Sequence, residues 1–283
     1  MTKIAIVTDS TADIPLTLQQ ELNILVIPLN VVFGETTYKD GVDITSKVFF
    51  EMLPGSSVHP STSQPSPGEF VDFYEQILKK YDSIISVHIS SGLSGTHQSA
   101  QMAMDLLPDA DITLVDSRTA SLGCGLAAIA GAEARNAGMD KAGILSVVQS
   151  VCEEQVLLLT VETLEWLQRN GRIGKASALL GSLLNVHPIL KVEKGLVAPH
   201  TKVRGNMSKV LAAIVEAGQD FVPAGSAVRL GVVHGNAPEE ARVLADMLGK
   251  VYNVKSVVYN EIGPVIGVHV GPGALGAIIA LSK

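Results

Sequence analysis

Aromatic and charged residues are both scarce in this sequence. Phe, Trp and Tyr make up 4% of the 283 residues, and Asp, Glu, Lys and Arg only 17%. Because 47% of the residues are hydrophobic, the chain can bury a large core and is not expected to be disordered. That core must consist of Val, Ile, Leu and Ala. Such an interior is typical of a parallel sheet and would also suit an alkyl ligand.

Several signatures of other protein classes are absent. No apolar run reaches the length of about 18 residues that crosses a bilayer, so stable membrane insertion is not expected. The net charge is −7 and no basic stripe occurs, which argues against nucleic acid as a partner. The two cysteines and seven histidines lack zinc-ligand spacing, and there is no P-loop. The sequence therefore predicts no metal and no cofactor.

The beginning of the chain, Met1 to Val7, enters a strand pattern directly and offers no signal-peptide pattern. Cys124 and Cys152 are most simply explained as buried thiols of an intracellular protein. We therefore expect a cytoplasmic location.

The first 155 residues alternate predicted strands and helices, which indicates βαβ units and a mostly parallel sheet. Strands are expected at 3–8, 24–33, 83–89 and 111–116. One helix is expected to begin at Asp13 to Pro15. Further helices are expected at 43–53, 66–80, 96–107 and 122–136. Ser66 and Glu69 form a capping-box pattern at the start of one of them.

The remaining residues favour an α+β arrangement. Strands are expected at 156–161, 228–234 and 254–259, a hairpin at 189–197, and helices at 162–168, 207–219 and 238–251. We predict an α/β fold of two domains, 1–155 and 156–283. The first contains a mostly parallel sheet with flanking helices, and the second is α+β.

One candidate anion site is the segment Ser90 to Thr96, which follows a predicted strand and begins a helix. Ligands of open α/β sheets bind at the carboxyl ends of the strands. The free amides of the first turn of a helix attract anions. The same residues would also serve simply to cap the helix. The segment nearly matches the nucleophile elbow G-x-S-x-G around Ser94 but fails at its last position, and a serine hydrolase is an alternative. The sequence does not identify its base: His97 is poorly placed on the same helix, and His269 could approach from the other domain.

Three other segments contain candidate binding groups. The hydroxyls of residues 61–63 lie between prolines and could donate hydrogen bonds to an anion, or could belong to a solvated linker. Arg169 and Arg172 near a predicted helix end could cap carbonyls or meet an anion. The G-x-G-x-x-G at 271–276 is no dinucleotide site, because only seven residues follow it. His269 beside it could be a packed core residue or a ligand contact.

Taken together, these segments resemble the DegV family of fatty-acid-binding proteins, which includes the FakB carriers. The resemblance covers nearly the whole chain and depends on the order of its short motifs. These motifs are Ile6 to Asp13, Pro28-Leu29, Tyr38 to Gly41, Ser61 to Pro65, Ser90 to Thr96, Val115 to Ser117, Leu164 with Arg169 to Ile173, Pro188 to Leu190, and Gly263 to Gly276.

The resemblance implies two α/β domains with one long-chain fatty acid between them. It implies that Thr62 and Ser94 hold the carboxylate, that Gly95 offers an amide, and that Arg172 and His269 lie near the headgroup. It also implies a non-catalytic carrier in lipid transport or fatty acid metabolism, which could present the acyl chain to a separate fatty acid kinase.

Two points stay open. His187 precedes the Pro188 motif where many members of the family are expected to have Lys, which leaves the charge near that strand undecided. A hydrolase or acyl-transfer enzyme using Ser94, and a binder of another small anion, remain the alternatives to the carrier.

Overall fold

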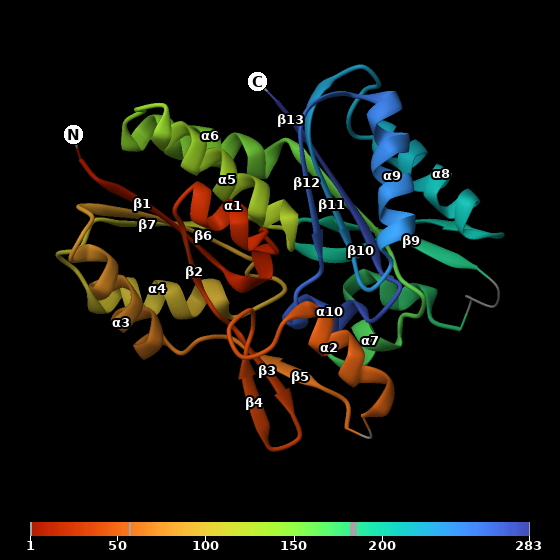
Figure 1. Cartoon of the computed structure of the whole chain (residues 1–283), viewed down its shortest axis with the longest axis horizontal. Coiled ribbons are helices and arrows are strands. Elements are labelled where there is room, and N and C mark those ends of the chain that lie inside the picture. The colour runs from red at the N-terminus through yellow and green to blue at the C-terminus, as the bar shows by residue number, and fades with distance from the viewer. Residues whose placement is uncertain (1, 57, 182–185, 283) are drawn as a thin grey trace.

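The computed structural model describes residues 2–56, 58–181 and 186–282. Within these residues the strands form a four-stranded, a six-stranded and a three-stranded sheet, with helices packed around them (Figure 1). The predicted α/β fold is confirmed, with a parallel sheet in the N-terminal part and a separate mixed sheet in the C-terminal part.

The first sheet is entirely parallel and has the order β2-β1-β6-β7. Its strands are β1 (Ile4–Asp9), β2 (Ile24–Ile27), β6 (Ser83–His88) and β7 (Ile112–Asp116). One face is covered by α3 (Pro67–Leu78) and α4 (Thr96–Leu106), and the other by α5 (Leu122–Asn136) and α6 (Lys141–Glu153). All residues of β1 and β6 are buried, as expected for central strands with helices on both faces.

The second sheet is mixed and has the order β10-β9-β8-β13-β11-β12. Its strands are β8 (Gln155–Thr160), β9 (His187–Glu193), β10 (Leu196–Val203), β11 (Ala227–His234), β12 (Asn253–Glu261) and β13 (Leu275–Leu281). Two amphipathic helices, α8 (Met207–Gln219) and α9 (Pro238–Val251), bury their apolar faces on one side of it.

Helix α5 lies between the two large sheets and joins them. Of its 15 residues, 12 are buried, and most of these are Ala or Gly. A Cβ atom on Gly125 would come within 2.5 Å of the carbonyl oxygen of Ala12. On the other side, a Cβ on Gly231 of β11 would lie 3.0 Å from Cβ of Leu122. Small residues therefore let both sheets pack closely on one helix.

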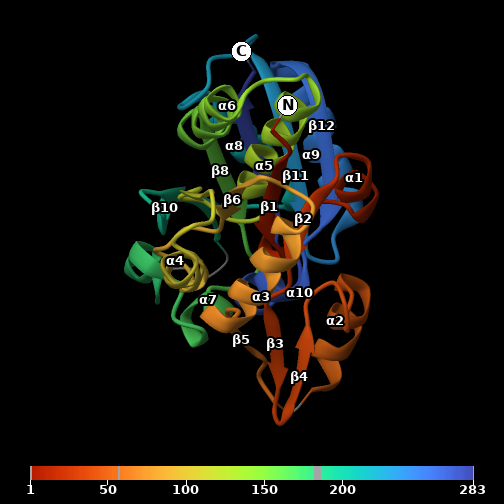
Figure 2. The ribbon, with the colours of Figure 1, turned by 90° about the vertical axis from the view of Figure 1, so that its left-hand side faces the viewer.

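The third sheet, of order β4-β3-β5, extends from the rest of the molecule together with α2 (Figure 2). Its strands are β3 (Asn30–Phe33), β4 (Thr36–Lys39) and β5 (Ser61–Ser63), and α2 covers Ser46–Met52. We call these four elements the flap. Phe33, Phe49 and Phe50 pack together and against Val265 and Val268 of α10 (Pro264–Val270). The flap is thereby attached to the C-terminal half.

Several sequence predictions are confirmed closely. The helices 122–136, 207–219 and 238–251 have the expected bounds, and the 189–197 hairpin forms with its turn at Lys194 and Gly195. The capping box of α3 is complete: the Ser66 hydroxyl accepts from the amide of Glu69, and the Glu69 carboxylate accepts from the amide of Ser66.

Other predictions are wrong. The expected strand 24–33 is broken at Pro28 into β2 and β3, which belong to different sheets. Asp13 does not cap a helix: it has φ 50°, and the short helix α1 (Leu16–Glu21) starts after Pro15 without a side-chain cap. The sequence also gave no indication of β4, β5, α6, α10 or β13.

The strands of the first sheet all precede residue 117, and those of the second all follow residue 154. A division into domains 1–155 and 156–283 is compatible with this. It stays a prediction, because α5 contributes to the packing of both sheets.

Candidate functional site

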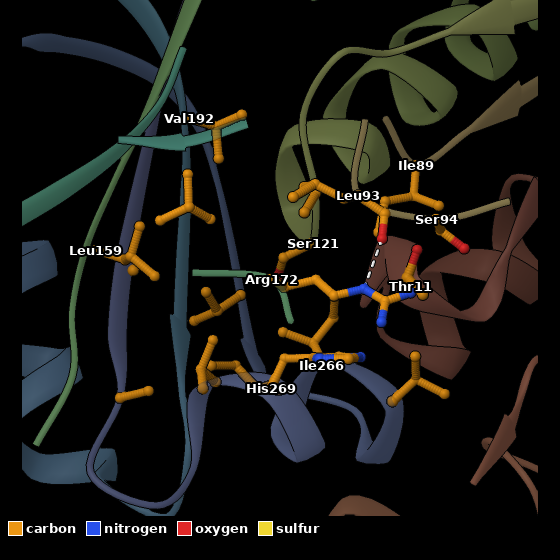
Figure 3. A pocket seen from close by; sticks show the side chains of 18 of the residues that line it. Thr11, Ile89, Leu93, Ser94, Ser121, Leu159, Arg172, Val192, Ile266 and His269 are labelled. Carbon is orange, nitrogen blue, oxygen red and sulfur yellow. Dashed lines mark hydrogen bonds between the residues drawn. The ribbon is translucent and has the colours of Figure 1, made fainter. Parts of the chain in front are cut away.

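A cavity lies at the carboxyl edge of the parallel sheet, where this sheet, the second sheet and the flap meet (Figure 3). Its volume is about 90 Å³. One enclosed water needs only about 10–15 Å³, so the cavity has room for a larger guest. The loops after β1 and β6 contribute to its wall, as expected for a ligand site in an α/β sheet.

The wall of the cavity has two chemically different parts. The second sheet and its loops contribute aliphatic side chains, among them Leu157, Leu159, Val192, Val197, Val233 and Leu275. Leu157 and Leu159 share one face of β8 because alternate residues of a strand point the same way. The polar side chains all come from the other wall: Thr11, Thr62, Gln64, Ser94, Ser121, Arg172 and His269. Apolar residues such as Ile89 and Leu93 lie among them. Figure 3 shows Leu159 and Val192 on one side of the cavity and Ser94 and Thr11 on the other.

Thr62 and His269 lie side by side although 207 positions separate them in the sequence. Strand β5 of the flap carries Thr62, whose Oγ1 lies 3.0 Å from Nε2 of His269 on α10. Burial, together with the nearby charge of Arg172, lowers the pKa of His269 to about 3, so the imidazole is neutral. Its Nδ1 atom is buried and has no hydrogen-bond partner among the described residues. A buried nitrogen without a partner at a cavity wall is suited to meet a polar ligand atom.

Ser94 and Gly95 occupy the loop between β6 and α4. Oγ of Ser94 lies 2.8 Å from Oγ1 of Thr96, and Ser94 lines the cavity. Gly95 precedes the helix but is not part of the cavity wall; a Cβ there would lie 2.7 Å from Nε2 of Gln64. The Gln64 side chain thus lies against Gly95, and Gln64 lines the cavity where Gly95 does not. That the Gly95 amide binds a ligand stays a prediction.

Arg172 follows α7 (Glu165–Arg169) and connects the C-terminal half with the loop that carries Ser94. Its Nε donates to the carbonyl oxygen of Leu93 at 3.0 Å, and its Nη1 donates to the carbonyl oxygen of Asn170 at 2.8 Å. The guanidinium group is directed toward the side where Ser94 and Thr11 lie (Figure 3). A positive charge fixed at this side favours an anionic group there.

The structure therefore brings Thr62, Ser94, Arg172 and His269 to one cavity. Reasoning from the sequence missed Ser121, and named Thr11 and Gln64 only as parts of motifs. The Ser121 hydroxyl group hydrogen-bonds to the carboxyl group of Asp13, and Thr11 donates to Asp9. A Ser or Thr near a strand end is too common a pattern to have singled these out.

The arrangement does not provide Ser94 with a base. Among the described residues, Oγ of Ser94 hydrogen-bonds to Thr96 and to neither His97 nor His269. A chain of the Ser-His-Asp type does occur elsewhere: Nδ1 of His88 lies 2.8 Å from Asp9, and its Nε2 lies 2.7 Å from Oγ of Ser86. All three residues are fully buried.

The buried Ser86 is also engaged by a second donor, because the Tyr74 hydroxyl donates to its Oγ at 2.9 Å. Neither Ser86 nor His88 lines the cavity. These side chains therefore satisfy one another's hydrogen bonds in the core, and Ser86 is not exposed as a nucleophile.

In the part of the chain that the structure describes, no group of His, Cys, Asp and Glu side chains could hold a metal ion. The same part contains no helix with the length and apolar character needed to pass through a bilayer.

Comparison with protein families decides the relationship of the chain. The family model described as "Uncharacterised protein, DegV family" matches residues 3–282. The chain belongs to the DegV family. It is 37% identical over 274 residues to Protein DegV of Bacillus subtilis strain 168, an alignment that covers 96% of this chain and 97% of that protein.

Solved structures of DegV proteins share the fold. A DegV family protein from Thermus thermophilus, described by its fatty acid binding, has 33% identity and a TM-score of 0.93, covering 99% of this chain and all of that one. DegV of Bacillus subtilis, described as a fatty acid binding protein, has 34% identity and a TM-score of 0.88, with both chains covered completely.

Proposed function

We propose that this DegV protein binds one long-chain fatty acid in the cavity, with the carboxylate held by Thr62 and Ser94 and the tail along the second sheet. The observation that carries the proposal is the division of the cavity wall. Hydroxyl groups, a neutral imidazole and one guanidinium group lie on one side, and aliphatic side chains from the second sheet lie on the other. This division matches a molecule with a small anionic head and a long apolar tail.

The energetics of such a ligand are favourable. Each buried CH₂ contributes about 0.8 kcal/mol, so about 15 methylenes contribute on the order of 12 kcal/mol before the tail is ordered. A buried carboxylate without partners would cancel much of this. Hydrogen bonds to a charged group contribute roughly 1.5–3 kcal/mol each, and the Arg172 guanidinium adds a compensating charge. The polar side chains thus reduce the cost of removing the headgroup from water.

Relatives support the same proposal. The DegV proteins of Thermus thermophilus and Bacillus subtilis described above are both named as fatty acid binding, and both align with this chain almost from end to end. The proposed role is a cytoplasmic carrier in lipid transport or fatty acid metabolism that does no chemistry itself. Presentation of the bound acyl chain to a separate fatty acid kinase is the finer part of this proposal.

Analysis of co-purified lipid tests the binding directly. We expect the protein purified from its expression host to carry close to one fatty acid per chain, detected by extraction and mass spectrometry under denaturing conditions. A delipidated sample should take up palmitate or oleate to the same ratio. Protein that stays free of lipid after incubation with both acids would overturn the proposal.

A further inference from the structure

Ser121 lines the cavity in a strained conformation. It immediately precedes α5 and has φ 53° and ψ −143°, a region of backbone space that glycine alone occupies readily. The residue is buried. Its hydroxyl group does not cap α5; instead it hydrogen-bonds to the carboxyl group of Asp13. A residue held in such a conformation beside a cavity is a candidate for a specific role, and Asp13 is the group that holds it.

Asp13 is fixed at the junction of three segments. Its Oδ2 contacts Ser121, and its Oδ1 accepts from the amide of Gly263 at 2.8 Å. Its main-chain oxygen accepts from Nδ2 of Asn260 at 2.7 Å. The residue is 5% exposed, and its own φ is 50°. The loop after β1, the start of α5 and the segment before α10 therefore all position this one carboxyl group.

The surroundings of Asp13 favour its neutral form. Burial raises the pKa of Asp13 to about 8, against the lowering effect of the hydrogen bonds from Ser121 and Gly263. The charged groups that act on it are Asp40 and Asp9, which raise the pKa further. Asp40 is itself buried, and burial raises its pKa to about 7. At neutral pH the Asp13 carboxyl group therefore retains its proton.

The protonation state of Asp13 decides what Ser121 offers to the cavity. Gly263 donates to Oδ1, and Oγ of Ser121 is paired with Oδ2, to which it donates when the carboxyl group is ionised. In a neutral Asp13 the proton belongs on Oδ2, so the direction reverses and the carboxyl group donates to Oγ of Ser121. The hydroxyl hydrogen of Ser121 is then free to point into the cavity. An ionised Asp13 must instead accept that hydrogen, and Ser121 then presents only lone pairs, which repel an anion.

We propose that Asp13 is a positioning residue for the ligand headgroup: its protonated carboxyl group turns the Ser121 hydroxyl toward the carboxylate, so that binding of the anion draws a proton onto Asp13. This inference rests on the proposed binding of a fatty acid. It assigns a role to a buried acid that does not touch the ligand, and it makes binding depend on pH in a range where the fatty acid itself is fully ionised.

Calorimetry at pH 8.5 measures the proton directly. Dodecanoate, below the concentration at which it forms micelles, is titrated into the full chain in two buffers of different ionisation enthalpy. On binding, we expect the wild type to take up a substantial fraction of a proton and Asp13→Asn to take up much less. Asp40→Asn, which changes the neighbouring acid, should keep most of the uptake.

Proton uptake that survives in Asp13→Asn, or binding by the wild type without any uptake, would overturn this inference and leave the fatty-acid proposal standing. Failure of the wild type to bind dodecanoate would overturn the fatty-acid proposal and this inference together.

Ser121→Ala gives an independent test that does not require the Asp13 variant to fold. The wild type should bind dodecanoate about tenfold more tightly than Ser121→Ala at pH 6.5, since the variant lacks one donor to a charged acceptor. This ratio should fall toward one at pH 9.5, where Ser121 of the wild type donates to ionised Asp13 instead. A ratio that does not change between these pH values contradicts the relay, because a purely structural effect of Ser121 would not follow the ionisation of Asp13.

Discussion

Two hydroxyl groups from separate elements form the proposed carboxylate site, Thr62 of strand β5 and Ser94 of the loop before α4. We expect Ser94→Ala and Thr62→Val each to weaken fatty-acid binding by about tenfold to hundredfold, because each change removes a donor to a charged acceptor. Titration calorimetry of the delipidated variants measures the loss. Since both donors serve one headgroup, the double variant should lose less than the two separate losses together.

Ser91→Ala is a matched control for these two changes. Ser91 belongs to the same loop as Ser94, but its hydroxyl donates to Asp116 at 2.6 Å and it does not line the cavity. Its affinity for fatty acid should equal that of the wild type. If Ser94→Ala and Thr62→Val also bind like the wild type while remaining folded, the headgroup lies elsewhere.

Ser94 should not act as a nucleophile. We expect no turnover of p-nitrophenyl esters or acyl-CoA by the wild type, because the Ser94 hydroxyl hydrogen-bonds to Thr96 and no histidine of the described part accepts its proton. The neutral His269 contacts Thr62 instead. The assay compares the wild type with Ser94→Ala under identical purification. Turnover that is present in the wild type and lost in the variant would favour the hydrolase.

At the scale of single residues, the sequence could indicate groups that stand in short polar motifs, and little else. Thr62 and Ser94 belong to runs of hydroxyl residues beside predicted strand and helix ends, so their type and place were informative. Arg172 and His269 could be assigned only through the resemblance to the family. Ser121 and Asp13 depend on contacts between residues 108 positions apart, which no local pattern contains.

At the scale of elements, local chemistry predicts best where it is self-contained. The capping box of α3 needs only Ser66 and Glu69, and both of its hydrogen bonds form. We expect Ser66→Ala to lower the free energy of unfolding by about 0.5–2 kcal/mol and to leave ligand affinity unchanged, since Ser66 is not part of the cavity wall. Urea denaturation measures the first effect and calorimetry the second. An unchanged urea midpoint would mean that α3 does not depend on its cap.

The elements that the sequence failed to predict depend on distant partners. An apolar run at 24–33 resembles one strand, but Pro28 separates β2, which pairs with β1, from β3, which pairs with β4 and β5. Strand β13 was missed because its continuous apolar run gives no alternating pattern when both faces are buried. Only its place between β8 and β11 explains it.

At the scale of the whole molecule, the shared helix α5 argues for cooperative unfolding. It packs on both large sheets, and Arg229 of β11 forms an ion pair with Glu133 of α5 at 2.5 Å. We therefore expect calorimetric heating of the delipidated protein to show one transition. Fatty acid at about 100 times its Kd should stabilise the folded state by about 2.7 kcal/mol and raise that transition by several degrees.

Two separate transitions would contradict this expectation. They would instead show that the parts before and after residue 155 unfold independently, as a strict two-domain division implies. A single transition that oleate shifts to higher temperature would show that the ligand binds the jointly folded state.

The single tryptophan of the chain gives the molecule a built-in optical reporter. Trp166 stacks on His59, with ring centroids 4.8 Å apart, and it packs against the aromatic cluster of the flap. Contact with solvent shifts the emission of an indole ring to longer wavelength. The emission wavelength therefore reports whether the aromatic cluster of the flap and His59 cover Trp166, without any label attached to the protein.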